Sequence, residues 1–385
     1  MSEPSAVQKT PAVAEQKSGP VFISSEIYRA TGYGSNHPLA IARIATVLDL
    51  CEGLGWLEPQ GYVDSPVASL EELSQFHSAE YIDALMAADR SGGVSVEVRE
   101  KFGLGTMENP VFKGLFERAS TSVGGSIEAA RQAAAGRIAY HPSGGTHHGR
   151  PDRASGFCYF NDPVFAILTF LNLGFERVLY VDIDAHHGDG VQDAFDNDPR
   201  VLCISVHEKD RWPYSGKFGD RGSGNARNLP VPRNINDSEM DYLIDSAVMP
   251  LGRDFDPQAT VITCGADGLA GDPLSAMQLS NGCLLRSVDK LCTLTDSTVI
   301  VGGGGYNPWT VSRLWAGIWG MLNGQTMPQS LPANCREILA KLECDLVDEE
   351  DVEPHWLNAL GDPDNFGPIR EEVRAVAENV LDDGS

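Results

Sequence analysis

Hydrophobic and polar positions alternate in blocks along the chain, and short β-rich runs give way repeatedly to longer helical patterns. Apolar runs rich in β-branched residues, typical of buried strands, occupy residues 20–24, 176–184, 200–206, 259–265 and 297–303. Apolar residues recur at helical spacing over residues 38–53, 70–90, 111–135, 163–173, 239–252, 276–294 and 308–322. Strands that alternate with helices predict an α/β fold, with a parallel sheet covered by helices on both faces.

Polar clusters fall where such a sheet binds its ligands. Asp182, Asp184 and His186 end one predicted strand, Asp267 follows another, and the glycine run 302–305 follows a third. Ligands of parallel sheets bind beyond the carboxyl ends of the strands. We therefore expect these three clusters to meet at one edge of the sheet.

The first of these clusters has the composition of a metal site. Residues two apart in a strand face the same side, so Asp184 and His186 can project together, and Asp267 could supply a third ligand. One imidazole and two carboxylates leave a coordination position open and suit Zn²⁺, with Fe²⁺ or Mn²⁺ as alternatives. The competing interpretation is that the carboxylates form turns and His186 is a hydrogen-bonded core histidine. The convergence of three such residues favours the metal.

A second histidine pair, His147 and His148, lies in a glycine-rich loop. Two adjacent histidines beside a metal could accept and donate protons, provided that carboxylates orient their rings. Asp182 follows an apolar run, so its carboxylate is expected to be buried and hydrogen-bonded, for example to a histidine whose ring it orients. Asp189 could orient the ring of the other histidine. A histidine doublet in a loop is weak evidence alone, and the nearby metal cluster strengthens it.

A run of four glycines between a strand and a helix presents Tyr306. The run lacks both the Lys-Ser/Thr pair of a phosphate-binding loop and the glycine spacing of a dinucleotide-binding loop. A phenol at a metal site can instead stabilise an oxyanion. Metal, histidine and tyrosine together predict metal-assisted hydrolysis of an amide.

Composition narrows the class of partner. The formal net charge is −25, and no Lys/Arg cluster appears, which argues against binding to nucleic acid. The charge would attract cationic ligands such as Lys-rich peptides or polyamines; the alternative interpretation is that it only keeps the protein soluble. The eight cysteines form no Cys-x-x-Cys pair, and several lie in apolar runs, so we expect free thiols in a reducing compartment. The sequence shows no signal peptide and no apolar run long enough to span a membrane, which favours the cytoplasm.

No Pro/Gly/Ser-rich linker divides the chain after its first residues. Residues 1–19 are rich in Ala, Ser, Pro, Gln and Lys without periodicity, and we expect a disordered tail. Residues 20–385 are expected to form one domain, with an acidic surface segment beginning at about residue 344.

Several stretches together resemble the zinc-dependent histone deacetylase superfamily, which includes bacterial acetoin-utilisation deacetylases and acetylpolyamine amidohydrolases. The matching stretches are SGGTHHG, SGFCYFND, YVDIDAHHGDGVQDAF, CGADGLAGDPL and GGGGYN, with weaker matches in SNHPLAIAR and FHSAEYI. They occur in the family's order over roughly residues 20–325. The resemblance implies the single-domain arginase/deacetylase α/β fold, with an eight-stranded parallel sheet flanked by helices. It also implies a deacetylase that removes acetyl or other short acyl groups from an acyl-lysine side chain or a small acylamide.

The resemblance assigns roles residue by residue. It implies that Zn²⁺ is bound by Asp184, His186 and Asp267. The implied catalytic residues are His147 and His148, with His148 as general base and acid, Asp182 orienting His147, Asp189 orienting His148, and Tyr306 stabilising the oxyanion. A structural K⁺ is implied at Asp182, Asp184, His186, Ser205 and Val206, partly through backbone carbonyls. His187 receives no chemical role, and we expect it to be structural.

The substrate site departs from the family pattern in places. Gly156 and Phe157 match one wall of an acyl-lysine tunnel, and Tyr214 is assigned to the other wall, although Ser-Gly follows it where Pro-Gly is usual. Glu108 is assigned to the substrate-binding rim, where the family has an aspartate. Leu274 stands where polyamine-specific members carry a glutamate, which disfavours a dedicated polyamine enzyme.

The sequence argues against two other functions. A two-manganese ureohydrolase would need further bridging aspartates, and residues 265–273 read GADGLAGDP, without the DxDxxDP arrangement. An inactive protein that only binds acylated partners would be expected to have lost a ligand, a histidine or Tyr306, and none is missing. A homo-oligomer is left open by the sequence.

Overall fold

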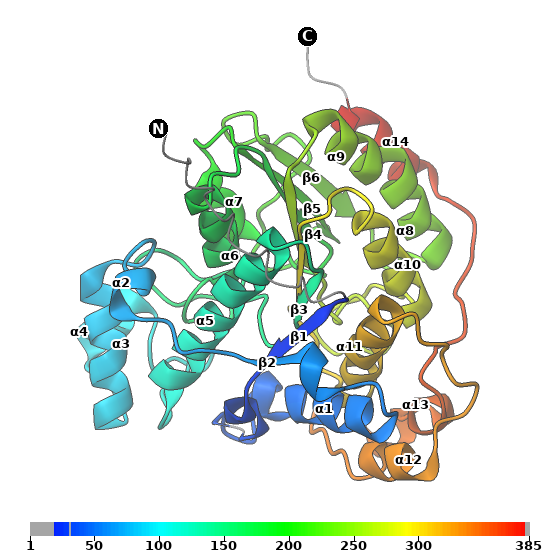
Figure 1. Ribbon diagram of the computed structural model, residues 1–385, viewed down its shortest axis with the longest axis horizontal. Coiled ribbons are helices and arrows are strands. Elements are labelled where there is room, and N and C mark those ends of the chain that lie inside the picture. The colour runs from blue at the N-terminus through cyan, green and yellow to red at the C-terminus, as the bar shows by residue number, and fades with distance from the viewer. Residues whose placement is uncertain (1–18, 31, 382–385) are drawn as a thin grey trace, which may run out of the picture.

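The computed structural model describes residues 19–30 and 32–381, and one eight-stranded, all-parallel sheet runs through its centre (Figure 1). The strand order is β2-β1-β3-β8-β7-β4-β5-β6. The strands are β1 (Val21–Ser24), β2 (Tyr62–Asp64), β3 (Ala139–His141), β4 (Val178–Asp182), β5 (Val201–Glu208), β6 (Ala226–Val231), β7 (Ala259–Thr263) and β8 (Thr298–Val301). The helices are α1 (Ile44–Gly53), α2 (Leu70–Leu73), α3 (Ala79–Ser91), α4 (Val96–Phe102), α5 (Leu115–Ala134), α6 (Asp162–Asn172), α7 (Asp189–Phe195), α8 (Asp237–Leu243), α9 (Met249–Phe255), α10 (Asn281–Leu291), α11 (Pro308–Leu322), α12 (Ala333–Leu339), α13 (Pro354–Asn358) and α14 (Glu371–Leu381). The α/β class and the eight parallel strands are as expected.

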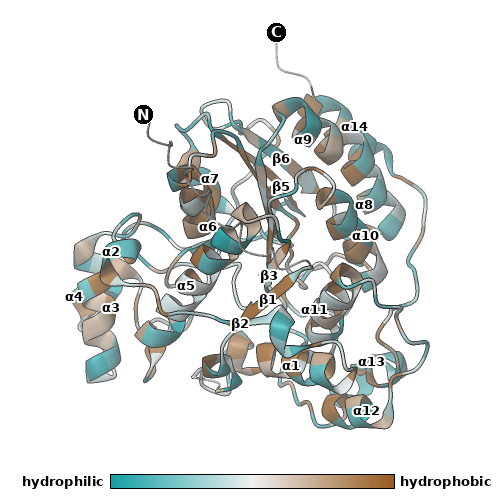
Figure 2. Cartoon of the chain, in the orientation of Figure 1, coloured by the Kyte–Doolittle hydropathy of each residue, from teal (hydrophilic) through white to brown (hydrophobic). Residues whose placement is uncertain are grey.

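The sheet separates two helical layers. Helices α5, α6 and α7 pack on one face, against alternate strand residues such as Val178 and Tyr180. Helices α1, α8–α11 and α14 pack on the other face, against Leu179 and Val181. The strands are largely brown and the helices carry both colours in Figure 2, as expected for a sheet buried between amphipathic helices.

Three strands, β2, β3 and β6, were not predicted by the hydrophobic pattern. β2 and β3 have three residues each, too short to show any periodicity. β6 carries Arg227, Asn228 and Pro230, and it lies at the edge of the sheet, where a proline is tolerated. The five strands that the pattern predicted are β1, β4, β5, β7 and β8.

Three predicted helices are interrupted. The region 38–53 divides into a 3₁₀ turn, Pro38–Ala40, and α1, which begins at Ile44. The region 70–90 divides into α2 and α3, because Ser78 starts a new helix by accepting a hydrogen bond from the backbone N–H of Tyr81. The region 239–252 contains a π-helical turn, Ile244–Val248, between α8 and α9. Within residues 19–30 and 32–381, no helix is long and apolar enough to cross a membrane.

The predicted disordered tail lies outside the described residues, apart from Gly19. The acidic segment from residue 344 is mostly exposed, as expected, and contains a short 3₁₀ helix, Glu349–Asp351.

The strands β3, β8, β7 and β4 are consecutive neighbours at the centre of the sheet. Their carboxyl ends are level, because His141 pairs with Val301, Val301 with Thr263, and Thr263 with Asp182. The loops that follow these four strands are therefore brought together at one edge of the sheet, where the candidate site residues lie.

Candidate active site

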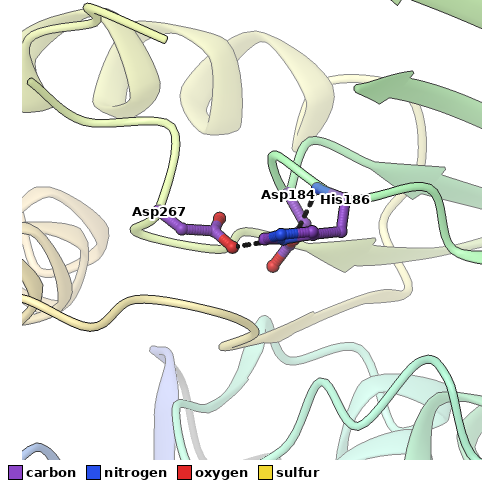
Figure 3. Close-up of side chains that lie close together, drawn as sticks. All are labelled: Asp184, His186 and Asp267. Carbon is purple, nitrogen blue, oxygen red and sulfur yellow. Dashed lines mark hydrogen bonds and ion pairs between the residues drawn. The ribbon is translucent and has the colours of Figure 1, made fainter. Parts of the chain in front are cut away.

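The side chains of Asp184, His186 and Asp267 point toward one another at this edge (Figure 3). One potential ligand atom from each lies within 4.8 Å of the others. His186 Nδ1 is 2.8 Å from Asp267 Oδ2 and 3.2 Å from Asp184 Oδ1. Ile183 and Ala185 pack into the core on the opposite face, as the alternation along the chain predicts.

This cluster fits a divalent cation. Both carboxylates are 0% exposed, and burying two negative charges is costly unless a cation compensates them. Burial opposes a proton on His186, yet Asp184 and Asp267 raise the pKa of its imidazole to about 10, which reflects the excess of negative charge. A nitrogen and two carboxylate oxygens form a donor set suited to Zn²⁺ or Fe²⁺. Asp184, His186 and Asp267 could thus hold a metal.

Backbone N–H groups hold the two carboxylates in place. Asp184 Oδ2 accepts a hydrogen bond of 2.6 Å from Gly304 N, and Asp267 Oδ1 accepts one of 3.0 Å from Ala185 N. A Cβ added to Gly304 would lie 2.0 Å from Asp267 Oδ2, so only glycine allows this approach. Arg43 supports the same loop by donating to the carbonyl oxygens of Gly303 and Gly305 at 3.0 and 3.2 Å.

Both histidines of the loop after β3 are buried, and each ring contacts a carboxylate. His147 Nδ1 lies 2.7 Å from Asp182 Oδ2, and His148 Nδ1 lies 2.7 Å from Asp189 Oδ1. Arg150 in turn contacts the other oxygen of Asp189. Each carboxylate therefore fixes one ring nitrogen and leaves Nε2 of that ring for other contacts.

The two histidines differ in their electrostatic environment. Burial lowers the pKa of His147, but the carboxylates of Asp182 and Asp184 outweigh that effect and raise it to about 9. Burial and the neighbouring charge of His147 lower the pKa of His148 to about 3, despite its hydrogen bond to Asp189. These opposite shifts favour a proton on His147 and an unprotonated Nε2 on His148, which could accept a proton.

Tyr306 lies at the end of the glycine loop and lines the same pocket as His148 and His186. Burial and the negative charges of Asp267 and Asp184 raise the pKa of its phenol well above the usual range, so the phenol keeps its proton. Its backbone N–H donates a 2.7 Å hydrogen bond to Asp272 Oδ2. Sequence reasoning missed Asp272, although it lies in the quoted stretch CGADGLAGDPL.

A pocket of about 720 Å³ opens above these groups. Its lining includes all five residues that the sequence assigned to substrate binding, namely Glu108, Gly156, Phe157, Tyr214 and Leu274. The ring of Phe157 faces Tyr306 edge-on at 5.8 Å between centroids. Glu108 accepts a hydrogen bond from the backbone N–H of Gly156 and so connects the rim to the first wall.

Trp212 lines the pocket together with Tyr214, the residue that the sequence assigned to the second wall. Tyr214 is 69% exposed at the mouth, and Trp212 lies deeper, with its ring 4.6 Å from that of His148 and 6.4 Å from that of His186. A Cβ added to Gly156 would meet the Trp212 ring at 2.4 Å, so the two residues close the pocket on this side. The sequence prediction named Tyr214 for this wall and did not name Trp212, which lies two positions earlier.

The residues matched to a K⁺ site lie on two neighbouring strands, β4 and β5, and in the loop that follows β4. Asp182 of β4 pairs in register with Ser205 of β5, and Val206 follows. The Asp182 carboxylate accepts hydrogen bonds from the Tyr180 hydroxyl at 2.7 Å and from Asp184 N at 3.1 Å. The Ser205 hydroxyl lies 2.9 Å from His207 Nδ1.

The segment after α11 supports the loops that carry Tyr306 and Asp272. Trp356 of α13 stacks with Trp309 at 6.4 Å and closes over Gly271, where an added Cβ would lie 2.7 Å from its ring. Cys344 Sγ lies 3.6 Å from the Tyr306 carbonyl oxygen.

The chain is similar to known proteins in sequence and in fold. The family model described as the histone deacetylase domain matches residues 37–322. The acetoin utilization protein AcuC of Bacillus subtilis is 35% identical over 327 residues, which cover 81% of this chain and 84% of AcuC. Histone deacetylase 8 of Xenopus tropicalis is 34% identical over 298 residues, 75% of this chain and 80% of that protein. The chain spans 61% to 85% of the length of these and other curated relatives.

A solved structure agrees with the sequence matches. The crystal structure of a histone deacetylase homologue from Aquifex aeolicus superposes with a TM-score of 0.89 at 33% identity, and the match covers 94% of this chain and 100% of that one. The chain therefore belongs to the histone deacetylase family.

Proposed function

We propose that this protein is a metal-dependent amidohydrolase that removes acetyl or other short acyl groups from an acyl-lysine side chain or a related acylamide. The observation that carries the proposal is the convergence of three kinds of group on one pocket. His186 of the buried Asp-His-Asp cluster, the imidazole of His148 and the phenol of Tyr306 all line it. Family membership supports the same reaction class.

Zn²⁺ or Fe²⁺, held by Asp184, His186 and Asp267, would supply a Lewis acid that polarises the amide carbonyl and lowers the pKa of water. His148 accepts the proton of the attacking water at Nε2, because its Nδ1 is engaged by Asp189. The same atom then delivers the proton to the leaving amine. His147 is oriented by Asp182, and its ring lies 3.9 Å from that of His148, so it is proposed as the second member of the histidine pair.

Tyr306 donates its hydroxyl proton in a hydrogen bond to the oxyanion that develops on the acyl carbon. Phe157, Gly156 and Trp212 confine the acyl-bearing chain and exclude water from it. Glu108 and Leu274 lie at the mouth of the pocket and are proposed to contact the remainder of the substrate.

Three further assignments belong to this proposal. A structural K⁺ would sit beside Asp182 and Ser205, where backbone carbonyls of the two strands can contribute. The protein would act in the cytoplasm on an acylated peptide or a small acylamide, with no nucleic-acid or membrane partner. The net charge of −25 supports a positively charged substrate, because it attracts cationic molecules to the protein.

The test is a panel of fluorogenic acyl-lysine peptides and acetylpolyamines, assayed with the protein loaded with Zn²⁺ or with Fe²⁺. We expect turnover of at least one acetylated substrate, inhibition by a hydroxamate, and loss of turnover after chelation. Metal-loaded protein that hydrolyses no member of the panel would contradict the proposal. Turnover of acetylpolyamines alone would favour a small-molecule amidohydrolase over a lysine deacetylase.

A further inference from the structure

His187 is the one histidine of the stretch AHHGDG to which the proposed chemistry gives no role. It is buried, and its ring points away from the metal cluster toward the loop that follows β5. His187 Nδ1 lies 2.8 Å from the Ser215 hydroxyl, and His187 Nε2 lies 3.0 Å from Gln192 Oε1. Since Gln192 Oε1 is an acceptor, Nε2 carries the proton, and Nδ1 accepts a hydrogen bond from Ser215.

The orientation of Gln192 is fixed by its other partners. Its Nε2 donates a 3.0 Å hydrogen bond to Asp220 Oδ2, and its Oε1 also accepts from Asn228 Nδ2 at 2.8 Å. Asn228 donates in addition to the Asp220 carbonyl oxygen at 3.1 Å. His187 is therefore part of a buried hydrogen-bond network that holds residues 215–220.

His207 holds the same limb of the loop from the other side. Its Nε2 donates to the Gly216 carbonyl oxygen at 2.9 Å, and its ring lies 4.7 Å from that of His187. Gly216 has a φ of +66°, and an added Cβ would lie 2.6 Å from both imidazoles. The two histidine rings thus pack against the backbone at Gly216, a position that only glycine can occupy.

The other limb of the loop is fixed by an ion pair. Arg211 bonds the buried Glu208 carboxylate at 2.6 and 2.8 Å and donates to the Leu274 carbonyl oxygen at 2.7 Å. A 2.7 Å hydrogen bond from Tyr214 N to Arg211 O closes the turn between the limbs. Trp212 lies in this turn, between one anchor at Arg211 and the other at His187 and His207.

We propose that His187 is a positioning residue: through Ser215 it fixes the loop 209–220 so that Trp212 closes the pocket beside His148 and limits the size of the acyl group. The part concerning acyl size rests on the proposed deacetylase function, whereas the part concerning Trp212 does not. Trp212 contacts the proton-transferring histidine, so a displaced ring would widen the pocket where the acyl carbon reacts.

The position of Trp212 can be measured without substrate. Protein labelled with 5-fluorotryptophan has six tryptophan ¹⁹F resonances, and the Trp212 resonance is the one lost in Trp212→Phe. We expect His187→Ala and Ser215→Ala to shift or split that resonance and to leave the other five unchanged. Ser215 is exposed, so Ser215→Ala keeps the test valid if His187→Ala does not fold. The matched control is Ser223→Ala, which removes an exposed hydroxyl bonded to Asp196, away from this pocket.

The second measurement is acyl selectivity. We expect both variants to retain metal and to lower the preference for acetyl- over butyryl-lysine peptide, as a ratio of kcat/KM, by about threefold to tenfold. An unchanged Trp212 resonance in a folded His187→Ala or Ser215→Ala protein overturns the positioning role. A shifted resonance with unchanged selectivity overturns the link to acyl size. If the wild-type protein hydrolyses none of the peptides, the proposed function fails, and the ¹⁹F result still decides the positioning role.

Discussion

The floor and the rim of the pocket are built in different ways. The floor residues follow β3, β4, β7 and β8 closely and are buried, and their positions depend on the level ends of four paired strands. The rim residues Glu108, Trp212 and Leu274 come from longer connections and are held by separate side-chain contacts such as Arg211 with Glu208. Floor geometry therefore depends on the sheet itself, and rim geometry depends on a few replaceable anchors. Substitutions at the two levels should accordingly differ in size and in kind.

The largest effect is expected for Asp267→Ala in the floor. The change removes one of three candidate ligands and leaves His186 with a single carboxylate neighbour. We expect elemental analysis to find little bound metal and the assay to find no turnover, since the affinity of a metal site depends on its ligand count. A variant that retains the wild-type amount of metal would remove Asp267 from the ligand set.

Tyr306→Phe tests the floor without touching the metal. The substitution deletes one hydroxyl and preserves the ring contact with Phe157. We expect kcat on an acetyl-lysine peptide to fall by about 10²-fold or more, because an oxyanion donor is lost, with metal content unchanged. Turnover equal to that of the wild type would exclude Tyr306 from the reaction.

Asp189→Asn should have a smaller effect in the same region. The amide is uncharged and has one acceptor oxygen, so it cannot serve both His148 and Arg150 as the two carboxylate oxygens do, and the imidazole is held less firmly. We expect kcat to fall by about 10-fold to 100-fold, as for other residues that orient a functional histidine. Metal analysis provides the control, and the outcome that would contradict the role is an unchanged kcat.

The smallest effects are expected at the rim, where two aromatic residues can be compared directly. Trp212→Ala removes a ring packed against His148 and should lower kcat/KM by about tenfold. Tyr214→Ala removes a ring that is 69% exposed and should change kcat/KM by no more than about twofold. The reverse order of effects would restore Tyr214 as the second wall.

The sequence predicted the floor better than the rim for a physical reason. Asp182, Asp184 and His186 follow a buried strand whose alternation sets the direction of each side chain, so their grouping with Asp267 could be inferred. The loop 209–220 has no such periodicity. Tyr214 adopts a φ of +63°, and its ring points to the mouth of the pocket, which no hydrophobic pattern indicates. Short strands such as β2 were missed for the same lack of periodicity.

Trp356 and Cys344 contact the loops that carry Tyr306 and Asp272, so a segment outside the catalytic residues supports the site. The shared domain ends at residue 322, and both of these residues lie beyond it. A chain cut at that boundary would keep every proposed catalytic residue and lose the packing behind Gly271 and the Tyr306 carbonyl. Substitutions in the segment after α11 are therefore expected to alter turnover without changing any proposed catalytic residue.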